Sequence, residues 1–176
     1  NGVVDNVTTL LGYDASAPAE VQEFSADIYR ESCRLLELVN DIIKLSRLDE
    51  GGDKLERQRV ELHALAENVL ANLESVAEKC HVTLSLTGGA AYVTGVPALL
   101  SEMLYNLCDN AVKYNVDGGS VRVDIAQSTA ETVLTVSDTG IGIAPDKQEW
   151  VFDRFTKVDS FKPGSGIGLY LCRRIL

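Results

Sequence analysis

The stretch EVQEFSADIYRESCRLLELVNDIIKLSRL, residues 20–48, contains no glycine or proline and therefore favours one uninterrupted helix. Its apolar residues recur at spacings of three and four, interrupted only by Glu31, which is the pattern of a heptad seam. Because this stripe is too apolar for a helix that faces water alone, the sequence predicts a two-helix hairpin or a four-helix dimer bundle. A core helix packed on its own domain is the alternative. The seam residues are Val21, Phe24, Ile28, Leu35, Leu38, Ile42 and Leu45.

A charged, glycine-bearing run, DEGGDKLERQR at residues 49–59, follows this helix and predicts a linker. We therefore expect part of a helical hairpin at 1–48, the linker at 49–59, and a globular domain at 60–176. Upstream, the stretch GVVDNVTTLLGYD is typical of the end of a preceding helix.

The globular part mixes helical and strand patterns. The patterns predict a helix at 62–80, a strand at 81–86, a short strand around 92–94, and a helix from Pro97 to about Tyr114. Two alternating stretches, SVRVDIAQS and TVLTVSD, lie either side of a turn at Ala130–Glu131 and predict an antiparallel hairpin. The fold class is therefore predicted to be α+β, a two-layer sandwich with one antiparallel-rich sheet covered on one face by helices.

Composition restricts the possible partners. The chain of 176 residues carries a formal net charge of −10, which disfavours duplex nucleic acid because that affinity depends on Lys and Arg neutralising phosphates. Its four cysteines are far apart and form no CxxC pair, so reduced thiols are expected rather than a zinc site or a disulfide framework. No apolar run approaches the roughly 20 residues that span a bilayer.

One helix carries a polar stripe. In PALLSEMLYNLCDNAVKY, Asn106, Asn110 and Lys113 lie at i, i+4 and i+7 and hence on one face. Buried amides need partners, and an asparagine carbonyl oxygen is a hard ligand that Mg²⁺ accepts beside phosphate oxygens and water. A solvated helix face is the alternative explanation of this stripe.

Two glycine motifs follow. In DTGIG, residues 138–142, an aspartate ends a strand; its carboxylate can accept a hydrogen bond from an exocyclic amine, although a purely structural turn has the same sequence. In GSGIG, residues 164–168, glycines open a helical segment whose backbone N–H groups form an anion site. The glycine spacing differs from the dinucleotide fingerprint, and the sequence contains no GxxxxGK[ST] loop.

In this order, the motifs strongly resemble the catalytic, ATP-binding domain of bacterial sensor histidine kinases, in the Bergerat-type superfamily that includes gyrase, MutL and the heat-shock chaperones. NLCDNAVKY is similar to the N box, DTGIG to the first glycine box, VFDRF to the phenylalanine box and GSGIGL to the second glycine box. The resemblance covers residues 60–176, and residues 20–48 are similar to the second helix of the family's dimerisation hairpin.

The resemblance implies ATP and Mg²⁺ as cofactors and assigns roles by position. Asn110 and Asn106 would hold the metal ion, Lys113 would neutralise phosphate charge, and Asp138 would read the adenine amine. Either Arg154 or Lys157 would reach the γ-phosphate, unless both are solvated lid charges. The implied catalytic residues are Asn106, Lys113, Arg154 and Lys157. The implied nucleotide-binding residues are Asn106, Asn110, Lys113, Tyr114, Asp138, Gly140, Gly142, Ile143, Phe155, Gly164, Ser165, Gly166, Ile167, Gly168 and Leu169.

The reaction type depends on one position. ATPase members of the superfamily carry a glutamate four residues before the metal asparagine; this chain has Asn106 there, and an amide cannot act as a general base. The resemblance therefore implies a protein histidine kinase that transfers the γ-phosphoryl group of ATP to a histidine and, through it, to a response regulator receiver domain. A hydrolytic ATPase and a non-catalytic nucleotide-binding dimerisation scaffold are the alternatives.

The chain departs from the family's pattern at both ends. His63 and His81 are interpreted as structural, so the phosphoacceptor histidine is expected to precede Asn1, and the family's closing strands are expected to follow Leu176. The resemblance further implies a homodimer formed through the hairpin, and a cytoplasmic location as a domain of an inner-membrane sensor.

Overall fold

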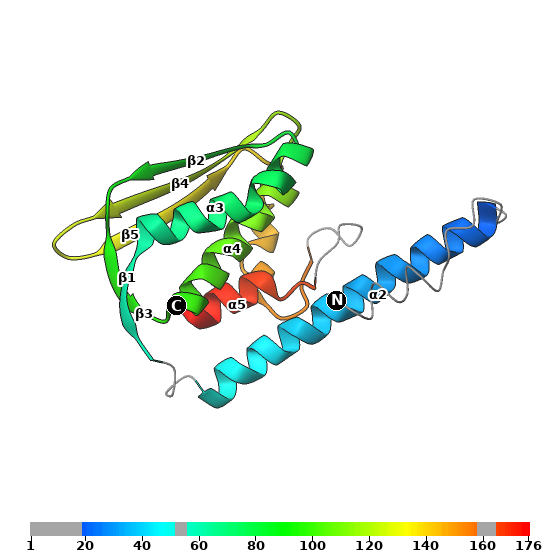
Figure 1. Ribbon diagram of the computed structural model, residues 1–176, viewed down its shortest axis with the longest axis horizontal. Helices are drawn as coiled ribbons and strands as arrows, with labels where there is room; N and C mark the ends of the chain where they lie inside the picture. The colour runs from blue at the N-terminus through cyan, green and yellow to red at the C-terminus, as the bar shows by residue number, and fades with distance from the viewer. Residues whose placement is uncertain (1–18, 52–55, 158–164) are drawn as a thin grey trace. The chain divides into compact units, whose positions relative to one another are not determined.

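The computed structural model describes residues 19–51, 56–157 and 165–176 (Figure 1). The chain divides into two compact units, one that contains nearly all of helix α2 (Ala19–Gly51) and one that extends from Gly51 through the globular part. The predicted end of a preceding helix, the middle of the predicted linker and Gly164 lie outside the described residues.

Helix α2 is continuous over 33 residues, as the absence of interior glycine and proline predicts. Ile28, Leu35 and Ile42, three residues of the predicted seam, are 42%, 55% and 51% exposed. These apolar side chains are therefore exposed along the helix. Helix α2 continues to Gly51 and a strand begins at Gln58, so regular secondary structure enters both ends of the segment predicted as a linker, 49–59.

That strand, β1 (Gln58–Glu61), pairs antiparallel with β3 (Tyr92–Gly95), and Val60 lies opposite Val93. The sequence reasoning missed β1 because Val60 is its only buried residue and charged residues surround it. In addition, the guanidinium of Arg59 lies 3.8 Å from the centre of the Tyr92 ring. The two strands form a small sheet of their own, so the strands of the described residues make two sheets rather than the expected one.

The larger sheet has the strand order β2 (Thr83–Gly88), β4 (Ser120–Gln127) and β5 (Thr132–Asp138). Strands β4 and β5 form the predicted antiparallel hairpin, while β2 pairs with β4 in parallel. Along β4, Val121, Val123 and Ile125 are buried and alternate with more exposed residues, which is the pattern of a sheet with one covered face.

Three helices complete this unit: α3 (Leu62–Lys79), α4 (Pro97–Lys113) and α5 (Gly168–Ile175), with short 3₁₀ turns η2 (Pro145–Lys147) and η3 (Trp150–Phe152). Figure 1 shows α3 and α4 on the same side of the larger sheet, and the α+β class is confirmed.

The core lies between these helices and the sheet. Leu73 of α3 and Leu104 of α4 are fully buried, and each such side chain contributes about 2 kcal/mol of hydrophobic stabilisation. Helix α5 packs on α4, where the Cys172 thiol donates to the Met103 carbonyl oxygen at 3.5 Å. Within the described residues, no helix combines the length and apolar character needed to cross a bilayer.

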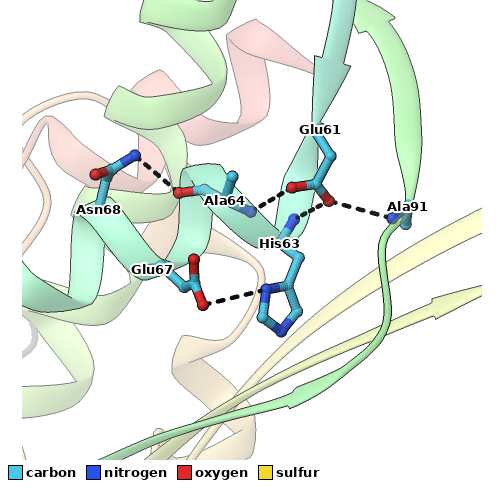
Figure 2. A network of polar contacts seen from close by, with 6 residues as sticks. All are labelled: Glu61, His63, Ala64, Glu67, Asn68 and Ala91. Atoms are coloured by element: carbon cyan, nitrogen blue, oxygen red, sulfur yellow. Dashed lines mark hydrogen bonds and ion pairs between the residues drawn. The ribbon is translucent and has the colours of Figure 1, made fainter.

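Glu61 joins three elements at the start of α3 (Figure 2). Its carboxylate accepts hydrogen bonds from the backbone N–H groups of His63, Ala64 and Ala91, at 2.9, 2.7 and 3.3 Å. The first two are free amides of the helix N-terminus, and the third belongs to the segment leading into β3. These hydrogen bonds, that from Ala64 above all, lower the pKa of Glu61.

Candidate functional site

The polar stripe of α4 contains two amide side chains, those of Asn106 and Asn110, for which the described residues provide few or no hydrogen-bond partners. The Nδ2 atom of Asn106 is buried and makes no hydrogen bond, and no hydrogen bond to the half-buried Asn110 side chain occurs in the described part of the chain. A buried amide nitrogen without a partner costs about 1–3 kcal/mol. Such a cost is typical of a group that waits for a ligand, so the observation favours a site over a solvated face.

Lys113, the third member of the stripe, is already paired. Its Nζ atom lies 2.7 Å from Oδ2 of Asp109, one helical turn earlier, and the Asp109 side chain is only 16% exposed. The sequence reasoning missed Asp109, although its i,i+4 spacing to a lysine is a known signal of a helical ion pair. Lys113 would have to share its charge between this carboxylate and any phosphate.

The Asp138 motif lies directly against the C-terminal end of α4. The backbone N–H of Ile141 donates to the Tyr114 carbonyl oxygen at 3.1 Å, and the N–H of Gly140 donates to Oδ1 of Asp138 at 2.8 Å. A Cβ atom on Gly140 would lie 2.4 Å from the Tyr114 carbonyl oxygen, so only glycine permits this approach. Gly142 has φ +67° and open space around it.

A pair of residues that the sequence reasoning did not select, Asn115 and Thr139, connects the same two segments. The Thr139 hydroxyl donates to Oδ1 of Asn115 at 3.0 Å and accepts from the N–H of Ser120 at 2.9 Å. The only signal in the sequence was the position of Asn115 just after a helix and just before two glycines, which is common in turns.

The phenylalanine motif forms η3 and the residues after it. Phe152 is 37% and Phe155 is 59% exposed, and Phe155 has φ +62°, an uncommon conformation for a bulky residue. Between them, the guanidinium of Arg154 donates to the Tyr170 hydroxyl at 2.7 Å and lies 4.7 Å from the centre of its ring. Arg154 is therefore held on α5.

The second glycine motif contacts both the phenylalanine motif and α4. Gly166, at φ +74°, approaches the backbone of Phe155 and Thr156 so closely that a Cβ atom would lie 2.8 Å from it. At Gly168, a Cβ atom would lie 3.3 Å from Oδ1 of Asn106. The structure thus brings the second glycine motif to the first asparagine of the α4 stripe.

The other predicted site residues differ in how far their side chains are exposed. The Ile167 side chain is fully buried in the core, so it is not accessible to a ligand. Ile143 is 40% exposed, and its carbonyl oxygen accepts from Nε2 of Gln148 at 3.1 Å. Lys157 and Leu169 are half-buried, and Ser165 falls in the unit of α2.

The side-chain oxygen atoms of this site suit a hard cation whose remaining ligands are oxygen atoms of a bound molecule. Among the described residues, no group of three or more His, Cys, Asp or Glu side chains is placed to hold a metal ion. The carbonyl oxygens of Asn106 and Asn110 remain, and oxygen donors of this kind suit Mg²⁺, which is usually completed by substrate phosphates and water.

Part of the chain matches a known protein family. Residues 95–176 match the family described as Histidine kinase-, DNA gyrase B-, and HSP90-like ATPase. Sensor histidine kinase RppB of Synechocystis sp. is 31% identical over 175 residues, which cover 96% of this chain and 38% of that protein. The chain thus spans well under half the length of this relative.

Two solved structures share the fold. Full-length ShkA in complex with AMPPNP has a TM-score of 0.74 at 23% identity, over 99% of this chain and 38% of that one. Histidine kinase ThkA in complex with the response regulator protein TrrA has a TM-score of 0.71 at 20% identity, over 99% of this chain and 52% of that one.

Proposed function

Residues 95–176 belong to the histidine kinase-, DNA gyrase B- and HSP90-like ATPase family, and from this membership we propose that the chain is the ATP-dependent core of a protein histidine kinase. The observation that carries the proposal is the convergence of both glycine motifs on α4. Gly140 approaches Tyr114 at one end of the stripe, and Gly168 approaches Asn106 at the other. A nucleotide spanning the two motifs would lie along Asn106, Asn110 and Lys113.

Each residue has a definite task in this proposal. Oδ1 of Asp138 is occupied by the Gly140 N–H, which leaves Oδ2 to accept a hydrogen bond from the adenine amine. Asn110 and Asn106 would hold Mg²⁺, which when bound neutralises phosphate charge. The N–H groups at the start of α5 would hold phosphate oxygens.

The cations of the site have alternative partners. Lys113 would exchange part of its interaction with Asp109 for phosphate, and Arg154 would leave the Tyr170 ring to reach the γ-phosphate. Lys157 is the second candidate for that contact. Tyr114, Gly142, Ile143 and Phe155 would line the base and lid portions of the site.

Asn106 decides between transfer and hydrolysis. An amide at this position can bind a metal ion but cannot remove a proton from water, so the site lacks a general base there. We therefore assign the chain to two-component signalling, with a histidine outside these residues as acceptor and a response regulator receiver domain as the next partner. The exposed seam of α2 supports a homodimer, and we expect the domain to lie on the cytoplasmic side of a membrane-associated sensor.

The test uses the parent protein, which includes the acceptor histidine, incubated with γ-labelled Mg-ATP. We expect protein-bound label that is labile in acid and stable in alkali, and its loss in Asn110→Ala. Asn68→Ala is the matched control, because within the described part of the chain the Asn68 amide makes a single hydrogen bond, to the Ala64 carbonyl oxygen on the exposed face of α3. Release of inorganic phosphate without protein label would identify a hydrolytic ATPase, and failure to bind ATP would identify a scaffold.

A further inference from the structure

Asn115 uses its whole side chain to join three segments. It follows Tyr114, the C-cap of α4, and its Nδ2 atom donates to the carbonyl oxygens of Ala111 in α4 and Ser120 in β4, at 2.9 and 3.1 Å. Its Oδ1 atom accepts from the Thr139 hydroxyl at 3.0 Å. Both ends of the amide are therefore satisfied, and the three segments are tied to one another.

Thr139 completes the connection from the other side. It follows Asp138 directly, its N–H donates to the Ser120 carbonyl oxygen at 3.1 Å, and its hydroxyl accepts from the Ser120 N–H. Gly119 provides the space, since a Cβ atom there would lie 2.1 Å from Oδ1 of Asn115 and 2.8 Å from the Thr139 hydroxyl. The arrangement has room for these side chains and for no bulkier residue at position 119.

We propose that Asn115 and Thr139 are positioning residues for base recognition, which hold the Asp138 carboxylate at a fixed place relative to the asparagines of α4. The inference rests on the proposed function, because Asp138 must read adenine for its position to matter. Neither residue touches the nucleotide; they act by fixing the segment that carries Asp138. An aspartate could not replace Asn115, because its carboxylate would face the Ala111 and Ser120 carbonyl oxygens without a proton to donate.

The test measures binding of ATP and GTP to this chain in the variants Asn115→Ala and Thr139→Val. Because the hydrogen bonds that fix Asp138 are lost, the preference for ATP over GTP should fall about tenfold in each variant. Thr139→Ser retains the hydroxyl and should retain the preference. Asn68→Ala is the matched control, since it removes a hydrogen bond from an asparagine to the fourth preceding carbonyl oxygen, as Asn115 makes to Ala111, without touching β4 or Thr139.

If Asn115 and Thr139 had a purely structural role, their substitution would lower the unfolding temperature. The folded variants would then keep the wild-type preference for ATP over GTP. An unchanged preference in both Asn115→Ala and Thr139→Val would therefore overturn the inference, and Thr139→Val alone decides if Asn115→Ala does not fold. Amide hydrogen exchange provides a readout independent of nucleotide. The Thr139 and Ile141 amides should exchange faster in Asn115→Ala than in the wild type, and unchanged exchange would overturn the inference. This readout needs no bound nucleotide. By contrast, failure of the wild-type chain to bind ATP would contradict the proposed function.

Discussion

The two ends of the α4 stripe are constructed differently. At the base end, defined as Tyr114, Asn115 and the Asp138–Gly142 segment, backbone and side-chain hydrogen bonds join the segments directly. At the phosphate end, defined as Asn106, Gly166 and Gly168, segments approach each other through glycines, while the Asn106 amide nitrogen is buried without a partner in the described chain.

This difference indicates where a ligand has most to contribute. The base end is complete in the absence of nucleotide, so it is prepared to select the base at little conformational cost. The phosphate end retains an unsatisfied N–H donor, and phosphate oxygens could relieve its desolvation cost by accepting a hydrogen bond. Selectivity is therefore expected to depend on the base end, and ligand-induced stabilisation on the phosphate end.

The largest expected effect comes from disrupting the base end with one methyl group. In Gly140→Ala the new Cβ atom would lie 2.4 Å from the Tyr114 carbonyl oxygen, which is backbone and cannot move aside cheaply. We expect the free energy of unfolding to fall by about 3 kcal/mol, measured by urea denaturation, together with loss of ATP binding.

Gly142→Ala is the matched control, because its Cβ atom would meet open space and only the φ of +67° opposes it. That strain costs about 1 kcal/mol. Equal destabilisation by the two substitutions would show that backbone conformation, and not the close approach to α4, defines the base end.

The next effect has opposite signs for stability and binding. Asn106→Leu removes the unpartnered Nδ2 atom, so we expect the free energy of unfolding to rise by about 1 kcal/mol while Mg-ATP binding is lost. Asn110→Leu should also abolish binding but should not stabilise the fold, because the Asn110 side chain has no atom among the buried unpartnered ones of the described chain. If Asn106→Leu were less stable than the wild type, the buried Nδ2 atom of Asn106 would not be a cost to the stability of the phosphate end.

Sequence reasoning predicted these two ends unequally, and the reason is physical. The Asn106, Asn110 and Lys113 stripe follows from helical periodicity alone, and the hairpin ending at Asp138 follows from alternation. By contrast, Asn115 became recognisable only through partners in β4 and after β5, because its hydrogen bonds depend on how distant segments meet. Local patterns specify which face a residue occupies, whereas a hydrogen bond between segments requires the tertiary structure.

A third prediction compares helices α4 and α5 through two buried thiols. Burial raises the pKa of Cys108 in α4 to about 12 and that of Cys172 in α5 to about 11, so both should react slowly with iodoacetamide, unlike the exposed Cys80. Helix α5 has only eight residues and begins at the phosphate end, at Gly168. We therefore expect Cys172 to react about tenfold faster than Cys108 through local opening.

Mg-ATP should slow the reaction of Cys172 far more than that of Cys108, and mass spectrometry of the alkylated peptides would measure both rates. The pH range should stay below 9, because stabilisation from a raised thiol pKa is complete below the unfolded value of about 8.5 and is lost as pH rises toward the folded value. Equal protection of the two thiols by nucleotide would indicate that α4 and α5 open together.

The smallest effect is expected outside both ends, at Glu61. Its lowered pKa means that its stabilising contribution is present above the unfolded pKa of about 4.3 and is lost as pH falls through the lower folded value. Glu61→Gln should therefore lower the unfolding temperature at pH 7, and the difference from wild type should shrink below pH 4. Glu67→Gln is the control, because among the described residues the Glu67 carboxylate pairs only with the His63 ring, at 3.6 Å. Since Glu61 caps α3 and touches neither end of the stripe, the preference for ATP over GTP should remain unchanged; a reduced preference would mean that base selection depends on the whole domain and not on the segment fixed by Asn115.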